Sequence, residues 1–128
     1  MIDRHAEITL APRPNSPRLA REFVSGMCLS WNATDFVEPG NLVVSELVTN
    51  AVTHAETDVR VDVTLSGDVL TVGVHDDAPG EPVIQPPSRH RLGGRGLAMV
   101  AAFAESWGVR RDRPGKTVWC RLTAPAGA

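Results

Sequence analysis

A β-hairpin is predicted by residues 59–76, whose sequence is VRVDVTLSGDVLTVGVHD. Apolar side chains occupy every second position of residues 59–65, which is typical of a strand with one buried face. The Ser-Gly-Asp run at residues 66–68 suits a tight turn between antiparallel strands. Alternation resumes over residues 70–76 and places Asp76 on the buried side. Because an unpaired buried carboxylate is costly, Asp76 must meet donors there, either in the turn that follows or on a ligand such as a purine amine.

The other elements are predicted from apolar periodicity and from the glycines and prolines between them. Ser16 is expected to cap the first helix, with Pro17 at its first helical position. The predicted elements are a strand over 5–11, helices over 16–31, 40–55 and 97–104, and strands near 107–111 and 117–122. This order predicts an α+β fold, a two-layer α/β sandwich with three helices on one face of a mixed, mainly antiparallel, five-stranded sheet.

Length, charge and composition indicate a small soluble domain. The 128 residues, of which 42% are hydrophobic, suit one compact domain, so residues 1–128 are expected to fold as a unit. The formal net charge of -2 disfavours nonspecific binding to nucleic acid or to an anionic membrane. Early charges and the lack of a long apolar stretch predict a cytoplasmic protein without a signal peptide or membrane span. Cys28 and Cys120 lack the spacing of a zinc or disulfide site.

The second predicted helix has a polar face opposite its apolar one. Glu46, Asn50 and His54 recur at intervals of four residues and share that face, with Thr53 as a neighbour. A carboxylate and an amide one turn apart offer the oxygen ligands that Mg²⁺ accepts. An ordinary solvated helix face is an equally good interpretation of this pattern, and capping of the helix end is an equal alternative for His54.

A glycine-rich loop is predicted just before the third helix. Residues 93–96, Gly-Gly-Arg-Gly, precede Leu97, and glycines there let phosphate oxygens approach the free amides of a helix start. Arg89, Arg91 and Arg95 surround these glycines and add the positive charge that a polyphosphate requires. By themselves such glycines also suit any tight loop.

Four segments in this order resemble the ATP-binding motifs of a known superfamily. They are ELVTNAVTHA at 46–55, DDAPG at 76–80, GGRGL at 93–97 and GKTVW at 115–119. The pattern resembles the GHKL superfamily, whose members have the Bergerat ATP-binding fold. It most resembles the stand-alone histidine-kinase-like ATPase domains of the bacterial anti-sigma factor and serine-protein kinase type. The resemblance spans residues 5–123.

The resemblance implies ATP and Mg²⁺ as cofactors and a role for each matching residue. Asn50 would coordinate Mg²⁺, and Glu46 would act as general base or orient the attacking group. Asp76 would accept a hydrogen bond from the adenine amine, with Thr117 hydrogen-bonding nearby and Gly80 leaving room for the base. The expected nucleotide-binding residues are Asn50, His54, Asp76, Gly80, Arg91, Gly93, Gly94, Arg95, Gly96, Leu97 and Thr117.

Three features of this sequence differ from the family pattern or leave a choice within it. Ala78 stands where the family motif has its first glycine. Asp77 is a second candidate for the adenine-binding carboxylate, although strand alternation favours Asp76. Residues 81–92, which would form the ATP lid, are a short segment for that role.

The resemblance also implies a protein partner. Because the nucleotide-binding motifs occupy nearly the whole chain, a phosphoacceptor is expected on another protein. The family suggests a serine or threonine of an anti-sigma-factor antagonist, so we expect an ATP-dependent serine/threonine kinase that regulates transcription. The alternative is a noncatalytic ATP-binding module that sequesters a sigma factor or another regulator. The first helix and the edge strand offer a surface for a homodimer.

Overall fold

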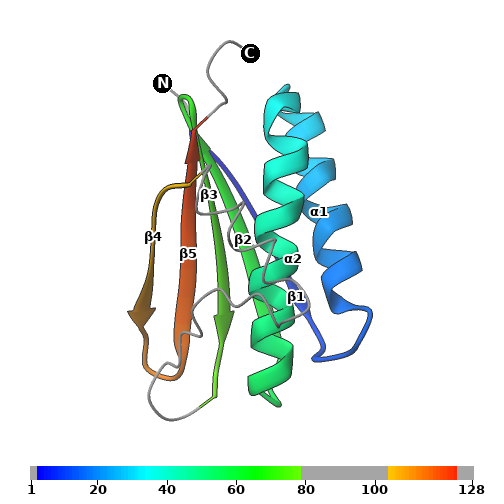
Figure 1. The fold of residues 1–128 in the computed structure, drawn as a ribbon, viewed down its shortest axis with the longest axis vertical. Coiled ribbons are helices and arrows are strands. Elements are labelled where there is room, and N and C mark those ends of the chain that lie inside the picture. The colour runs from blue at the N-terminus through cyan, green and yellow to red at the C-terminus, as the bar shows by residue number, and fades with distance from the viewer. Residues whose placement is uncertain (1–2, 79–103, 124–128) are drawn as a thin grey trace, which may run out of the picture.

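The computed structural model describes residues 3–78 and 104–123. Each strand and each α-helix in these residues lies close to a predicted range, whereas the short 3₁₀ helix was not predicted. In chain order, the elements labelled in Figure 1 and the short 3₁₀ helix η1 are β1 (Arg4–Leu10), α1 (Ser16–Ser30), η1 (Thr34–Phe36), α2 (Val37–His54), β2 (Val59–Ser66), β3 (Val69–Asp76), β4 (Ala104–Arg111) and β5 (Lys116–Thr123).

The five strands form one sheet in the order β1-β2-β3-β5-β4. The prediction of a mixed sheet is wrong for the described strands, because all four neighbouring pairs among them are antiparallel. The β2–β3 hairpin is confirmed, with Val61 opposite Val74 and with Gly67 at a φ of 59° in its turn. Because β3 and β5 pair antiparallel, the end of β3 meets the start of β5, and Asp76 lies opposite Lys116.

The helices α1 and α2 form the second layer and cover one face of the sheet, as Figure 1 shows. α1 and α2 pack against each other, and α2 lies mainly over β3. Apolar side chains from both layers, such as Val44 and Val48 of α2 and Leu70 and Val72 of β3, have no exposed surface. On the other face, β2 presents residues such as Arg60, which leaves that face largely polar. The predicted alternation thus decides which face the helices cover.

The predicted third helix falls on residues outside those described, except for Ala104. Ala104 begins β4 instead, so the prediction is wrong at that residue. Within residues 3–78 and 104–123 there are two α-helices and one 3₁₀ helix. None of these helices has both the length and the apolar character needed to cross a membrane.

The start of α1 differs from its prediction in one detail. Asn15, rather than Ser16, is the residue at the helix cap, while Pro17 lies in the first turn as expected. Ser16 is buried, and its hydroxyl donates to the Ala11 carbonyl and accepts from the Arg13 amide. The predicted capping role of Ser16 is wrong because its side chain closes the loop before the helix instead.

α2 begins at Val37, ahead of the predicted start at Gly40. Pro39 is compatible with this earlier start because amides in the first helical turn have no partner within the helix. Gly40 lies where the two helices and the sheet meet. A Cβ on Gly40 would lie 3.2 Å from Cγ1 of Val24 and 3.6 Å from Cδ2 of Leu70. The glycine therefore permits the close packing of α2 against α1 and β3.

Candidate functional site

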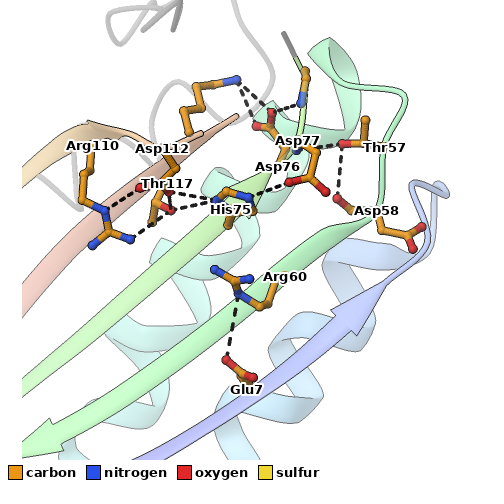
Figure 2. A network of polar contacts seen from close by, with 12 residues as sticks. Glu7, Thr57, Asp58, Arg60, His75, Asp76, Asp77, Arg110, Asp112 and Thr117 are labelled. Carbon is orange, nitrogen blue, oxygen red and sulfur yellow. Dashed lines mark hydrogen bonds and ion pairs between the residues drawn. The ribbon is translucent and has the colours of Figure 1, made fainter. Parts of the chain in front are cut away.

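Asp76 ends β3 on the face that the helices cover, as the alternation predicts. Its side chain is only 2% exposed, yet it has donors on both oxygens (Figure 2). The Ala78 amide donates to Oδ1 over 3.1 Å. The ammonium nitrogen of Lys116 lies 2.9 Å from Oδ2 and 3.2 Å from Oδ1. The following turn and the neighbouring strand together stabilise this buried carboxylate.

Gly115 fixes the approach of β5 to the end of β3. It has a φ of +83°, a conformation that side chains other than glycine rarely adopt. A Cβ on Gly115 would overlap the main-chain oxygen of Asp76 and would lie 2.7 Å from Cα of Asp77. Only glycine allows this contact, and the contact places the next residue, Lys116, directly beside Asp76.

The opposite face of the sheet carries a polar network centred on His75 (Figure 2). His75 is buried, with its side chain 10% exposed, and its Nε2 lies 2.8 Å from Oδ1 of Asp77. Its Nδ1 lies 3.0 Å from Oδ2 of Asp112 and 3.0 Å from the hydroxyl of Thr117. Because successive residues of a strand face opposite sides of the sheet, His75 lies on the side opposite Asp76. The Asp77 side chain contacts His75 and is half-exposed, whereas Asp76 is buried on the helix-covered face.

Asp112 anchors the turn between β4 and β5 to this network. Hydrogen bonds from Arg110, then from Thr117 and His75, lower the pKa of its carboxyl from 3.8 to about 2. The Arg110 Nε donates to Oδ1 over 2.8 Å, and the Thr117 hydroxyl donates to Oδ2. Asp112 is therefore ionised at neutral pH and holds the two strands together at this end of the sheet.

Thr117 does not lie beside Asp76, where the family resemblance implied a hydrogen bond near the adenine. Its hydroxyl is on the face opposite Asp76, where it binds His75 and Asp112, and the residue is 3% exposed. The register explains this position, because Thr117 pairs with His75 while Lys116 pairs with Asp76. Lys116, to which neither the motifs nor the resemblance assigned a role, occupies the position beside the buried carboxylate.

Glu46 and Asn50 lie one turn apart on α2, and both are partly buried. His54 is the last residue of the same helix. The end of α2 lies at the same end of the sheet as Asp76 (Figure 1). A hydrogen bond of 3.1 Å from the Asp77 amide to the Thr57 hydroxyl joins the loop after α2 to the end of β3.

The side chains of Glu46 and Asn50 suit a hard cation. A carboxylate and an amide oxygen are the ligand types that Mg²⁺ takes, and Mg²⁺ bound to a nucleotide needs only one or two protein ligands. A transition-metal site has no support in the part of the chain that is described, since no group of three or more His, Cys, Asp or Glu residues there could hold a metal ion. The donor set therefore fits Mg²⁺ together with phosphate oxygens.

The other predicted nucleotide-binding residues lie outside the described residues. They are Gly80, Arg91, Gly93, Gly94, Arg95, Gly96 and Leu97, together with the predicted lid at 81–92. Their roles remain predictions.

Alternation in the last strand contained a signal that would have identified Lys116. Cys120 and Leu122 are apolar, and counting back by two residues places Lys116 on their face of the strand. The same count places Thr117 on the opposite face. The partner of Lys116 could not be found in this way, because it lies 40 residues away in the sequence.

Comparisons with known proteins agree with this fold. A model of the family described as "Histidine kinase-like ATPase domain" matches residues 10–122. Among solved structures 13 chains match. One is the histidine kinase domain of the blue-light activated histidine kinase from Erythrobacter litoralis EL346, with 22% sequence identity and a TM-score of 0.56. The match covers 81% of this chain and 59% of that one, and at this identity it supports the fold alone. No curated protein is similar enough in sequence to match.

Proposed function

Because the chain belongs to the histidine kinase-like ATPase domain family, we propose that it binds ATP with Mg²⁺ in the cytoplasm and phosphorylates a partner protein. The acceptor in this proposal is a serine or threonine of an anti-sigma-factor antagonist. Members of this superfamily bind ATP, generally with Mg²⁺. The transfer step and the partner are the parts of the proposal that go beyond family membership.

The observation that supports nucleotide binding most directly is the position of Asp76. A carboxylate that is 2% exposed at the end of a central strand is unusual, because desolvation penalises its charge. It faces the helix layer, and the helix end that contains Asn50 lies at the same end of the sheet. This common position supports the proposal that Asp76 accepts from the adenine amine while Asn50 holds Mg²⁺.

In the proposed reaction, the acceptor hydroxyl oxygen forms a bond to the γ-phosphorus of ATP, and the bond to the β–γ bridging oxygen breaks to release ADP. Glu46 takes the hydroxyl proton, as a carboxylate general base. Asn50 would hold Mg²⁺ through its amide oxygen, and bound Mg²⁺ supplies neutralisation of charge on the phosphate oxygens. Asp76 orients the adenine by accepting a hydrogen bond from its amine group.

Nucleotide binding is tested by isothermal titration of the purified protein with ATP and Mg²⁺. We expect Asp76→Asn to weaken binding by about tenfold or more, since an amide accepts a weaker hydrogen bond than a carboxylate. Asp68→Asn is the matched control, because Asp68 is exposed in the β2–β3 turn. Absence of ATP binding by the wild-type protein would reject the proposal.

Phosphoryl transfer is tested with γ-³²P-labelled ATP, Mg²⁺ and a purified anti-sigma-factor antagonist protein, followed by phosphoamino acid analysis. We expect label on serine or threonine, and Glu46→Gln should slow transfer by about 10²-fold or more while ATP still binds. Glu56→Gln is the matched control, since Glu56 is exposed just after α2. ATP binding without transfer, with Glu46→Gln indistinguishable from wild type, would favour the sequestering module instead.

A further inference from the structure

Lys116 forms an ion pair with Asp76, the carboxylate that accepts from the adenine amine in the proposed function. Its ammonium nitrogen lies 2.9 Å from Oδ2 and 3.2 Å from Oδ1 of Asp76. Both side chains are on the helix-covered face, where Lys116 is 16% and Asp76 is 2% exposed. Lys116 is also the only lysine in the chain. A base that reaches Asp76 must therefore also meet this ammonium group.

The hydrogen-bonding capacity of Asp76 limits which base edge it can accept. A carboxylate offers about four acceptor positions. Among residues 3–78 and 104–123, the Ala78 amide takes one and Lys116 takes two, which leaves a single position, on Oδ2. Adenine presents one amine hydrogen there, beside an acceptor nitrogen, N1. Guanine presents two adjacent donors on the same edge and would have to displace an existing partner of Asp76.

The hydrogen-bonding capacity of Lys116 matches the other half of the adenine edge. An ammonium group has three donors, and Asp76 engages two of them in the described structure. The third has no other acceptor among the described residues, so it can donate to a ligand. A hydrogen bond from a charged donor is roughly twice as strong as one between neutral groups, so this contact would contribute to selectivity.

We infer that Asp76 and Lys116 recognise adenine as a pair, with Asp76 accepting from the amine and Lys116 donating to ring nitrogen N1. This inference rests on the proposed function, because it concerns the same nucleotide site. Gly115 makes the pair available, since its left-handed conformation brings β5 against Asp76 and places Lys116 beside the carboxylate. Thr117, on the opposite face of the sheet, cannot supply this contact.

Titration with nucleotide analogues tests the pair. In 1-deaza-ATP a C–H group replaces N1, and in 7-deaza-ATP a C–H group replaces N7, which is remote from the proposed pair. We expect the wild-type protein to bind 1-deaza-ATP about tenfold more weakly than ATP, the loss of one charge-assisted hydrogen bond. Binding of 7-deaza-ATP should be close to that of ATP. Equal binding of ATP and 1-deaza-ATP by the wild-type protein would overturn the inference without any variant.

The Lys116→Met variant tests whether the ammonium group causes the preference for ATP over 1-deaza-ATP. We expect this variant to bind ATP more weakly and to lose the preference for ATP over 1-deaza-ATP. Arg121→Met, an exposed change on the same strand, should retain the wild-type preference. Tighter ATP binding by Lys116→Met, or an unchanged preference, would show that Lys116 only competes with the base and would overturn the inference. Failure of the wild-type protein to bind ATP at all is a different result, which rejects the proposed function.

Discussion

Gly115 lies so close to Asp76 that a Cβ on the glycine would overlap the main-chain oxygen of Asp76. Its φ of +83° adds a second requirement, because side chains other than glycine are strained in that conformation. The contact joins two strands that are distant in the sequence, and it occurs at the buried carboxylate of the candidate site. The packing of the sheet and the shape of the site therefore depend on one residue.

Gly115→Ala should destabilise the protein by about 3 kcal/mol or more. The left-handed conformation alone costs about 1–2 kcal/mol for alanine, and the overlap with Asp76 adds to this. Urea unfolding followed by circular dichroism gives the change in the free energy of unfolding.

Gly26→Ala is the control for a glycine without such contacts. Gly26 lies within α1, and nothing lies within 4 Å of the position of its Cβ. Alanine there should stabilise the protein by about 0.5–1 kcal/mol, because it favours the helix. A loss of stability at Gly115 no greater than the change at Gly26 would contradict the assigned contact.

Asp112 should contribute to stability in a way that is lost in acid. Arg110, then Thr117 and His75, lower the pKa of Asp112 from 3.8 to about 2 in the folded protein. Because the folded-state value lies below the unfolded value, the contribution is complete above about pH 4 and disappears as the pH falls towards 2. Since Asp112 is partly exposed and screened by solvent, we expect on the order of 1 kcal/mol.

Urea unfolding of wild type and Asp112→Asn at several values between pH 5 and pH 2.5 measures this contribution. The difference in unfolding free energy between the two proteins should be largest at pH 5 and should shrink towards pH 2.5. Asp68→Asn, in the exposed hairpin turn, should show little difference at any of these values. A difference between wild type and Asp112→Asn that does not vary with pH would contradict the assignment.

The β2–β3 hairpin could be predicted closely because its determinants are local. Period-two alternation and the Ser-Gly-Asp turn both act within residues 59–76. The inward orientation of Asp76 follows from the same alternation. Ser16 shows the limit of local signals. A serine before a proline suits a helix cap, but it suits the loop contact to Ala11 that Ser16 makes just as well.

Pairing between β3 and β5 could not be predicted, because it joins residues distant in the sequence. The Lys116–Asp76 contact spans 40 residues, and the His75–Asp112 contact spans 37. No local pattern sets which residues of two such strands lie opposite each other. The family resemblance implied that Thr117 would bind near the adenine, whereas the register places it opposite His75.

The two cysteines should be unreactive in the folded protein. Cys28 and Cys120 are both buried and free, and burial raises the pKa of each thiol to about 11. The thiolate is the reactive form, so at pH 8 neither should react with Ellman's reagent until the protein unfolds. Ser30→Cys, at the exposed end of α1, should react at once and serves as the control. Rapid reaction of native wild type would contradict the burial of these residues.

The ion pair between Asp76 and Lys116 should show strong coupling in a double-mutant cycle. Asp76→Asn or Lys116→Met alone leaves the other charge largely buried without its partner, so each should cost about 2–4 kcal/mol. The double variant removes both charges and should cost less than the sum, with a coupling energy of about 1–3 kcal/mol from urea unfolding. Glu7→Gln and Arg60→Met provide the matched cycle, because that pair is 3.9 Å apart with side chains 57% and 42% exposed. Its coupling should not exceed about 0.5 kcal/mol, and equal coupling in the two cycles would contradict a special role for the buried pair.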